Sequence, residues 1–460
     1  MLGAIAAAKS EDIKPLEGES VDVPLLDAEA LTGSNVKSRE EAKFGAVKLV
    51  LENGIEIYVK PIDFKKDEVV IKTVGLGGKS ILDTEMLPSF EMNVAQVFTQ
   101  YSGVSDFPVA KLQKMLTGKA VSVLPYISSI EQGVSASGSP KDLETMLQLM
   151  YLYYTAPRFE ANEIEVGLNQ IKAVLPNILK QPNFIFQNRL TETLYGNSPR
   201  VPVLSEDMMS KVSVENYKKA YEKLFSDAAG VKVYITGNVN VDEILPLLQK
   251  YIGSLPVKSA EGLMYKDDNR NIVKGNIENV FAVPMEAPKT TVALIYSGDM
   301  KYNLENNILM ESLKYILDMT YTKTIREDEG GTYGVGVMAE VNSRPNEDFV
   351  LLVTFDTELA KSEKLIQLAI DGLKDIAENG VSEEYVAKTK ENFLKAFPEQ
   401  HIRNGYWLEV LDKYYGQNYD CDTEFVSVVE KCVNSANIQR IAKEIIAQGN
   451  MIKFIMNPQE

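Results

Sequence analysis

The residues best suited to chemistry lie in one stretch, residues 324–337, which reads TIREDEGGTYGVGV. A helix is expected from about residue 304 to Arg326 or slightly beyond, and the Gly-Gly pair after it suits the left-handed turn that ends a helix. A strand is expected to begin at Thr332. This order brings the Arg326 guanidinium and the Tyr333 phenol near one junction. There they could hold a peptide carbonyl, or the oxyanion that forms when the carbonyl is attacked.

The same residues also fit an ordinary protein surface. Arg326 could pair with the neighbouring Glu327 or Glu329, and Tyr333 could lie at a strand edge. Most charged clusters are solvated surface, and exposed ion pairs contribute little to stability. Residue types alone favour this second interpretation, so the choice between the two depends on other features of the chain.

Zinc chemistry is restricted by the near absence of histidine. The chain has one, His401, whereas a catalytic zinc site normally takes two or three histidines with carboxylate help. Neither H-E-x-x-H nor H-x-x-E-H can be written with one histidine. We expect His401 to be a surface or capping residue at the start of a helix. A carboxylate-only magnesium or calcium site stays open, although no calcium-loop pattern occurs.

Other catalytic patterns are no better supported. The GLGGK sequence at 75–79 lacks the spacing and the Lys-Ser/Thr ending of a phosphate loop, so we interpret it as a turn that ends a strand. There is no Gly-x-Ser-x-Gly elbow with a partner histidine. A cysteine nucleophile, Cys421 or Cys432, would need His401 nearby in space, and whether these two cysteines pair or stay free is open.

Composition indicates an ordinary globular protein of about two domains. The chain has 460 residues, of which 45% are hydrophobic and 25% charged. The net charge of −17 argues against nucleic acid as a partner, because phosphate binding needs clustered Lys and Arg. It favours solubility, and attraction of basic peptides is a second possibility. No stretch approaches the roughly 18 apolar residues of a membrane span.

The pattern of apolar residues predicts mixed strands and helices. Asn53-Gly54 between two alternating runs indicates a β-hairpin, and residues 69–74 and 231–235 indicate further strands. Ser213 is a plausible N-cap for one of the helices. Helices are expected at 87–100, 143–154, 160–179, 182–195 and 214–225.

The chain also matches itself when it is shifted by about 220 residues. Residues 69–74 then align with 291–296, and the Tyr-Gly pair at 195 aligns with the one at 415. Few identities survive, but the order of elements is kept. We therefore predict two copies of one α+β domain, each with a mixed, mainly antiparallel sheet packed with helices. The predicted divisions are a linker at 1–43, a domain at 44–257, a linker at 258–275 and a domain at 276–460.

The duplication and the Arg326/Tyr333 junction together resemble the M16 peptidases, the insulinase, pitrilysin and mitochondrial processing peptidase relatives with LuxS/MPP-like domains. The resemblance covers about 44–460 and is greatest to the C-terminal half of PqqL-like bacterial members. It implies a hydrolase of the metallopeptidase class in which two halves enclose a peptide chamber. The N-terminal half carries zinc on H-x-x-E-H, and the C-terminal half contributes an Arg and a Tyr seven residues apart to the substrate carbonyl. Arg326 and Tyr333 match that spacing.

One departure limits what this chain can do alone. Residues 89–98, where an active first domain would carry the zinc motif, read SFEMNVAQVF without histidine. The resemblance therefore implies that the chain is inactive by itself, with no cofactor of its own and zinc in a partner or upstream half. The linker-like residues 1–43 suggest that the chain is the C-terminal portion of a longer periplasmic or cell-envelope protein. The alternative is a stand-alone peptide-binding or scaffold homologue.

Overall fold

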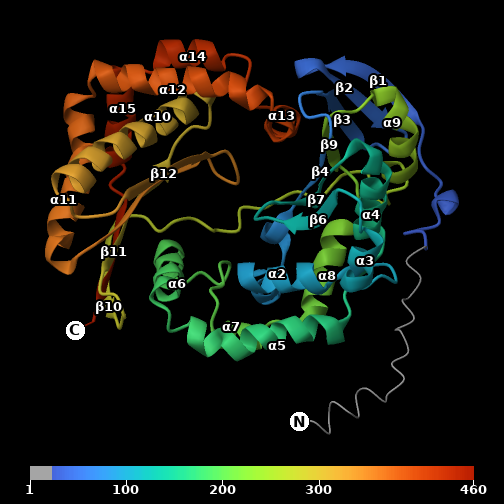
Figure 1. Cartoon of the computed structure of the whole chain (residues 1–460), viewed down its shortest axis with the longest axis horizontal. Helices are drawn as coiled ribbons and strands as arrows, with labels where there is room; N and C mark the ends of the chain where they lie inside the picture. The colour runs from blue at the N-terminus through green and yellow to red at the C-terminus, as the bar shows by residue number, and fades with distance from the viewer. Residues whose placement is uncertain (1–22, 460) are drawn as a thin grey trace, which may run out of the picture.

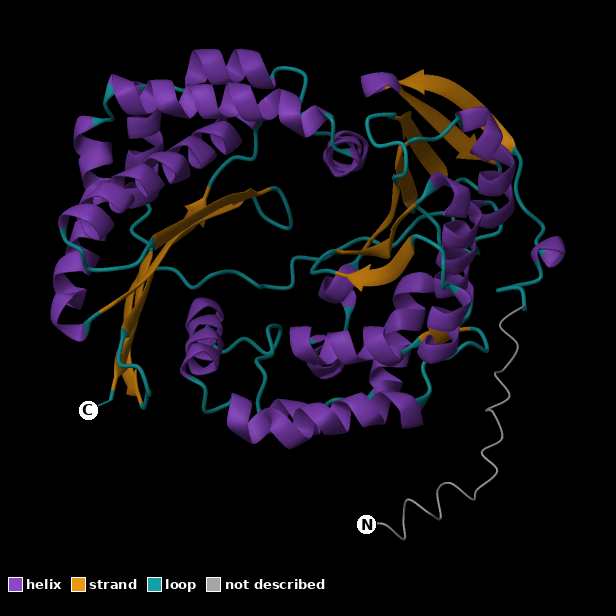
Figure 2. Ribbon diagram, in the orientation of Figure 1, coloured by secondary structure: helices purple, strands orange, loops and turns teal. Residues whose placement is uncertain are grey.

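A computed structural model describes residues 23–459, and part of the expected linker, 1–22, lies outside the described residues. Two sheets form the framework, one from each half of the chain (Figures 1 and 2). Both are mixed, mainly antiparallel, and packed with helices, so the predicted α+β fold class is confirmed. Among the described residues no helix is both long and apolar enough to cross a membrane.

The first sheet has seven strands around a large apolar core. Its second and third strands form the hairpin expected at Asn53-Gly54, where the Ile55 amide donates to Asn53 Oδ1 at 3.2 Å. In spatial order its strands are β1 (Val36–Ala42), β2 (Ala46–Leu51), β3 (Glu56–Pro61), β9 (Lys232–Gly237), β4 (Val69–Leu76), β7 (Glu131–Gly138) and β6 (Val121–Ile127). A separate pair joins β5 (Gly103–Val104) and β8 (Pro157–Arg158).

The helices of this half follow the predicted apolar periodicity closely. Ser213 caps one of them, because its side chain accepts from the Asn216 amide. The helices are α2 (Met92–Tyr101), α3 (Val109–Met115), α4 (Leu143–Thr155), α5 (Ala161–Ile178), α6 (Pro182–Tyr195), α7 (Glu206–Ser210), α8 (Val214–Phe225) and α9 (Val241–Leu247).

The second sheet has five strands, with the helices of its own half on one face and α6 of the first half against the other. Along β13 (Asp348–Thr357) every second residue is buried, which is the period of a strand with one face in a core. The other strands are β10 (Asn276–Val283), β14 (Met451–Pro458), β11 (Thr290–Asp299) and β12 (Val335–Asn342). The helices are α10 (Leu304–Tyr321), α11 (Leu359–Asn379), α12 (Glu383–His401), α13 (Asn404–Leu411), α14 (Phe425–Cys432) and α15 (Ser435–Ala447).

The two sheets share one topology. The order β3-β9-β4-β7-β6 in the first is matched by β10-β14-β11-β13-β12 in the second. In both, the first pair is parallel and the other three are antiparallel. The aligned segments 69–74 and 291–296 lie in the corresponding strands β4 and β11. The repeat seen in the sequence is therefore a repeat of strand order and direction.

Three local expectations differ from the structure. Residues 36–42, expected to be linker, form β1 and pair antiparallel with β2, so pairing rather than apolar alternation defines this exposed edge strand. The helix expected at 87–100 is preceded by a 3-10 turn, η4 (Thr84–Phe90), and α2 begins only at Met92. The strand expected from Thr332 begins at Val335, so Tyr333 lies in the loop before it.

The second half also packs directly on the first sheet. Helix α13 lies against β9 and β4 (Figure 1). Tyr415 stacks on Tyr58 with ring centroids 4.1 Å apart. The Lys72 ammonium donates to the Asp412 carboxylate at 2.6 Å, and the Asp412 side chain is only 9% exposed. This contact explains why the central strands of the first sheet are buried on both faces.

Candidate functional site

The stretch around Arg326 and Tyr333 joins a helix to an edge strand. Helix α10 continues as a π-helical turn, η7 (Thr322–Asp328), which is held in the core by the fully buried Ile325. The turn closes where the Gly331 amide donates to the Ile325 carbonyl at 3.3 Å. Gly330 has φ of 55°, so the predicted left-handed glycine after the helix is confirmed.

Both predicted side chains are free of partners within residues 23–459. Arg326 is exposed, and Tyr333 has 102% of the accessibility of a free residue. Glu329, one of the carboxylates that could have paired with Arg326, instead accepts from Lys364 at 2.6 Å. Two hydrogen-bond donors, one charged and one neutral, therefore lie on either side of one turn with unused capacity.

Tyr333 lines a cavity of about 390 Å³ between the second sheet and helix α6. Phe186 and Gln187 of α6 form one wall. On the sheet, Asp356 accepts from Lys289 at 2.7 Å and from Thr291 at 2.6 Å. Arg326 does not line this cavity, so the structure puts the two donors on the same turn but in different surroundings.

The first half has no zinc ligands where the resemblance would place them. At the start of α2, Glu91 accepts from the amides of Asn93 and Val94 at 2.9 and 3.3 Å and so caps the helix. No group of three or more His, Cys, Asp or Glu side chains that could hold a metal occurs in the part of the chain that the structure describes. These residues therefore do not fit the zinc site of the peptidases that the sequence resembles.

His401 differs from the expected capping residue at a helix start. It is the last residue of α12, and its Nε2 lies 2.6 Å from Asp422 Oδ1. Its ring stacks on Trp407, whose indole N–H donates to the His401 carbonyl at 2.8 Å. His401 therefore packs in an aromatic cluster with Tyr406 and Trp407 at the start of α13.

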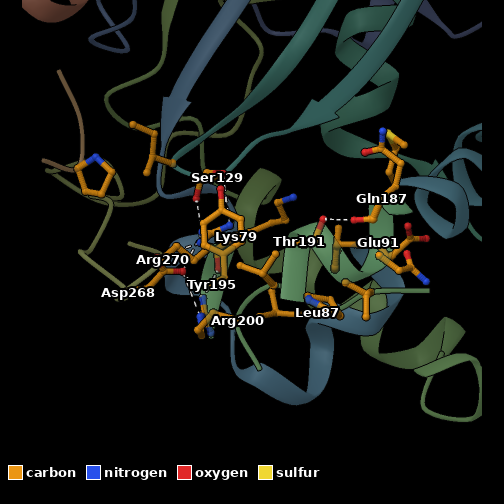
Figure 3. Close-up of a pocket in the computed structure, with 18 of the residues that line it drawn as sticks. Lys79, Leu87, Glu91, Ser129, Gln187, Thr191, Tyr195, Arg200, Asp268 and Arg270 are labelled. Atoms are coloured by element: carbon orange, nitrogen blue, oxygen red, sulfur yellow. Dashed lines mark hydrogen bonds and ion pairs between the residues drawn. The ribbon is translucent and has the colours of Figure 1, made fainter. Parts of the chain in front are cut away.

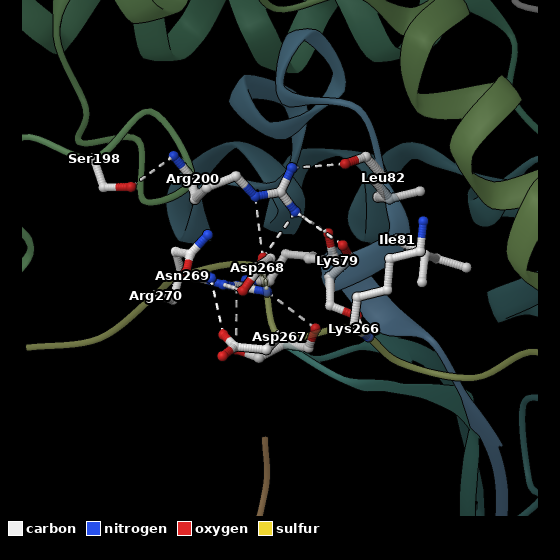
Figure 4. Close-up of polar contacts among 12 residues, drawn as sticks. Lys79, Ile81, Leu82, Ser198, Arg200, Lys266, Asp267, Asp268, Asn269 and Arg270 are labelled. Atoms are coloured by element: carbon white, nitrogen blue, oxygen red, sulfur yellow. Dashed lines mark hydrogen bonds and ion pairs between the residues drawn. The ribbon is translucent and has the colours of Figure 1, made fainter. Parts of the chain in front are cut away.

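A second cavity, of about 600 Å³, lies where the two halves meet (Figure 3). One end is built by Arg200, Asp268 and Arg270: both guanidinium groups bind Asp268 at 2.8 Å (Figure 4). Burial by itself raises the pKa of the Asp268 carboxyl, but the hydrogen bonds from Arg270 and Arg200 outweigh burial, and the pKa is lowered. Arg200 also donates to the Leu82 and Lys79 carbonyls, each at 2.7 Å, so its bond to Asp268 ties the segment 258–275 to the first half.

Lys79 reaches this cavity because of the turn that ends β4. The predicted strand-ending turn is confirmed: Gly77 and Gly78 have φ of 128° and 51°. Burial lowers the pKa of the Lys79 ammonium, and the nearby Arg270 lowers it further, against the opposing effect of Glu91 and Asp268. Sequence patterns missed this site because Arg200 and Lys79 are far from the segment 258–275 in the chain. The charge cluster at 266–270 was the one visible signal.

Gly78→Ala is expected to lower the free energy of unfolding by about 1–3 kcal/mol. A Cβ at this position would lie 2.6 Å from both the Glu131 amide and the Ser128 carbonyl, and the positive φ adds strain. Urea denaturation measures the loss. Gly118→Ala is the matched control, because its φ of 84° is also positive but nothing lies within 4 Å of the new Cβ. Equal losses in the two variants would contradict the steric argument.

Comparisons with known proteins relate this architecture to one family. A sequence model described as "Peptidase M16 inactive domain" matches residues 211–393. The "Zinc protease PQQL-like" of Arabidopsis thaliana is 23% identical over 423 residues, which cover 88% of this chain and 41% of that protein. The chain therefore spans less than half the length of this relative.

Solved structures share the fold. The periplasmic protease PqqL from Escherichia coli superposes with a TM-score of 0.81 at 18% identity, covering 100% of this chain and 50% of that one. The first half of the same protease, solved separately, superposes with a TM-score of 0.67 at 16% identity, covering 93% of each chain. The likeness is therefore to a half-unit, and it includes the first half of that protease.

Proposed function

We propose that this chain, an M16 peptidase-like half-unit distantly related to PqqL, is the non-zinc, C-terminal half of an M16-type zinc metallopeptidase. The assignment to the C-terminal half is supported by the presence of only one histidine in the sequence. It is also supported by the start of α2, which is capped by Glu91 and carries no histidine. The other half, in the same polypeptide or as a separate subunit, would hold the zinc. Location in the periplasm or cell envelope is proposed by analogy with the periplasmic protease PqqL.

The observation that carries the proposal is the pair of donors at Arg326 and Tyr333, neither of which has a side-chain partner within residues 23–459. A donor on a protein surface that makes no internal hydrogen bond is available to a ligand, and here two of them flank one turn. We assign to Tyr333 a hydrogen bond to the carbonyl oxygen of the scissile peptide. Arg326 adds a positive charge where the oxyanion develops. Both contacts strengthen as charge builds on that oxygen, which is the condition for lowering the barrier.

The same chain would form one side of the peptide chamber. The cavity beside Tyr333 is lined by α6 of the first domain and by strands of the second. A peptide held there contacts both domains, so its position depends on how α13 and the segment 258–275 fix them together. The chemistry at the zinc belongs to the other half, and this half contributes binding and orientation.

Reconstitution tests the proposal. The 460-residue chain is assayed with a fluorogenic peptide, alone and mixed with the zinc-bearing M16 half encoded in the same genome. We expect no hydrolysis by the chain alone, and zinc-dependent hydrolysis that requires both halves. Hydrolysis by the chain alone would contradict the proposal, as would peptide binding without hydrolysis in every mixture, which would favour the stand-alone binding homologue.

An immunoblot of source cells against this chain distinguishes the two arrangements. A band at about twice the chain's own 51.2 kDa means one polypeptide that carries both halves. A band near 51.2 kDa means a separate subunit, and co-purification then identifies the partner half.

A further inference from the structure

The cavity at the meeting point of the two halves is positively charged, although the chain as a whole carries −17. Four cationic and three acidic side chains line it: Lys79, Arg200, Arg270 and Arg344 against Glu91, Asp268 and Asp348. Its walls come from the η3 turn (Gly78–Ile81), helix α6, the segment 258–275 and the loop between β12 and β13 (Figure 3). Both halves therefore shape one charged chamber.

The three carboxylates are already engaged. Asp268 accepts from Arg200 and Arg270 (Figure 4). Glu91 accepts from two backbone amides and the Asn93 side chain as the cap of α2. Asp348 accepts from the Asn342 amide group at 2.8 Å. None of these acids makes a hydrogen bond or ion pair with Lys79 in residues 23–459.

The Arg side chains are engaged as well. Arg200 and Arg270 bind Asp268 and backbone carbonyls, and Arg344 donates to the Gly416 carbonyl at 2.7 Å. Lys79 is the exception, because within the described residues no acceptor lies at hydrogen-bond distance from its ammonium. An ammonium has three donors, and the partly buried Lys79 presents them to the cavity without a protein acceptor within residues 23–459. Within the part of the chain that the structure describes, Lys79 is therefore the one cation of this cavity whose ammonium has no protein acceptor.

We propose that this cavity binds a carboxylate of the peptide substrate, with the Lys79 ammonium as its counter-ion. The inference rests on the proposed function, because it names a feature of the peptide that the chamber would select. Tyr195 and Gln187, whose side-chain polar groups have no hydrogen-bond partner in residues 23–459, line the same cavity and supply neutral hydrogen bonds (Figure 3). The lowered pKa of Lys79 agrees with this role. Burial and Arg270 disfavour the positive charge of the ammonium, and the negative charge of a bound carboxylate would favour it.

Helix α6 connects this cavity to the one beside Tyr333. Gln187 lines both cavities, and Tyr195 lies eight residues further along the same helix. Eight helical residues span about 12 Å, a distance that about four residues of extended peptide cover. One peptide can therefore place a carbonyl near Tyr333 and a carboxylate near Lys79. The carboxylate can be an Asp or Glu side chain or the C-terminal group.

The first test uses small probes and does not depend on peptide binding. Lysines of the full chain are labelled by reductive ¹³C-methylation, and the Lys79 signal is assigned by its loss in Lys79→Arg. We expect N-acetylglutamate α-amide or N-acetylalanine to shift this signal and raise the pKa of Lys79. The neutral N-acetylglutamine amide is expected to leave it unchanged. No response to either carboxylate overturns the site, whatever the chain does with peptides.

The second test uses nine-residue peptides and calorimetry. One peptide has a central Glu with both ends blocked, one has Gln and a free C-terminus, and one has Gln with both ends blocked. We expect one carboxylate peptide to bind at least about tenfold more tightly than the neutral one. Tighter binding of the peptide with the central Glu means that the cavity takes a side-chain carboxylate. Tighter binding of the peptide with the free end means that it takes the C-terminal carboxylate.

Two variants and the comparison of both tests complete the design. Lys79→Met is expected to abolish the tenfold preference, whereas Lys218→Met, an exposed lysine on α8, changes the net charge equally and should keep it. A preference that persists in Lys79→Met overturns the assignment. If Lys79 responds to the small carboxylates but no peptide binds, the carboxylate site stands and the proposed peptide chamber fails.

Discussion

Tyr333→Phe and Arg326→Ala are each expected to lower kcat of the assembled peptidase by about 10²–10³-fold, the usual effect of removing one oxyanion donor. Each variant removes a contact that forms fully only in the transition state, so kcat and kcat/KM are expected to fall together. Both side chains are exposed and unpartnered within residues 23–459, so the free energy of unfolding is expected to change by less than about 0.5 kcal/mol. Steady-state kinetics on a fluorogenic peptide, with urea denaturation, measure both quantities.

Two matched controls separate this role from general surface effects. Lys323→Ala removes an exposed cation from the same π-helical turn, one turn before Arg326. Tyr101→Phe removes a phenol that, within residues 23–459, donates to the surface side chain of Gln170 and has no other partner. Both controls are expected to keep full turnover. Unchanged turnover in Tyr333→Phe and Arg326→Ala would remove the catalytic assignment, and a rise in KM alone would make the pair a ground-state binding site.

Lys72→Met is expected to destabilise the contact between the two halves by about 3 kcal/mol at pH 8, the lower end of the effect of breaking a buried ion pair. The Lys72 ammonium lies 2.6 Å from Asp412 and 3.9 Å from Glu131, so its removal takes away the cation that lies between these two carboxylates. Trp407 is the only tryptophan and lies on α13, so its fluorescence reports when this helix separates from the first sheet. Urea denaturation followed at Trp407 measures the change.

The loss in Lys72→Met is expected to depend on pH. Burial raises the pKa of Glu131 above its usual 4.5, and the charge of Asp412 raises it further, while Lys72 lowers it. Without Lys72 the folded-state pKa rises more, so the folded state binds a proton that the unfolded chain has released. Stability of the variant therefore falls as the pH rises above 4.5 through that pKa, and recovers as the pH is lowered again.

A surface ion pair provides the control for this prediction. Lys388→Met breaks an i,i+4 pair with Glu384 on α12, and this fully exposed pair is expected to contribute little to the free energy of unfolding. Equal losses in Lys388→Met and Lys72→Met, or a Lys72→Met loss that is the same at pH 5 and pH 8, would show that the buried pair does not connect the halves.

Local patterns predicted most of the helices and several strands. Helices α4, α6 and α8 begin and end within a residue of the expected positions, because their apolar spacing and caps are local properties. Edge strand β1 was not predicted, because five of its seven residues are exposed and the sequence shows no alternation of apolar residues there. Its hydrogen bonds to β2 are what make it a strand. The start of α2 was placed too early, because Pro88 and the Glu91 cap shift the helix beyond a 3-10 turn.

The sequence by itself determined the duplication, the absence of a histidine set for zinc, and the seven-residue spacing of Arg326 and Tyr333. These follow from residue types and their order along the chain. Only the tertiary structure decided that Tyr333 is fully exposed at a cavity and that Arg326 has no acidic partner within residues 23–459. It also decided that the Lys79 ammonium has no acceptor among the residues that the structure describes. Burial and the choice of hydrogen-bond partner depend on contacts between distant segments, and periodicity along the chain carries no information about which segments meet.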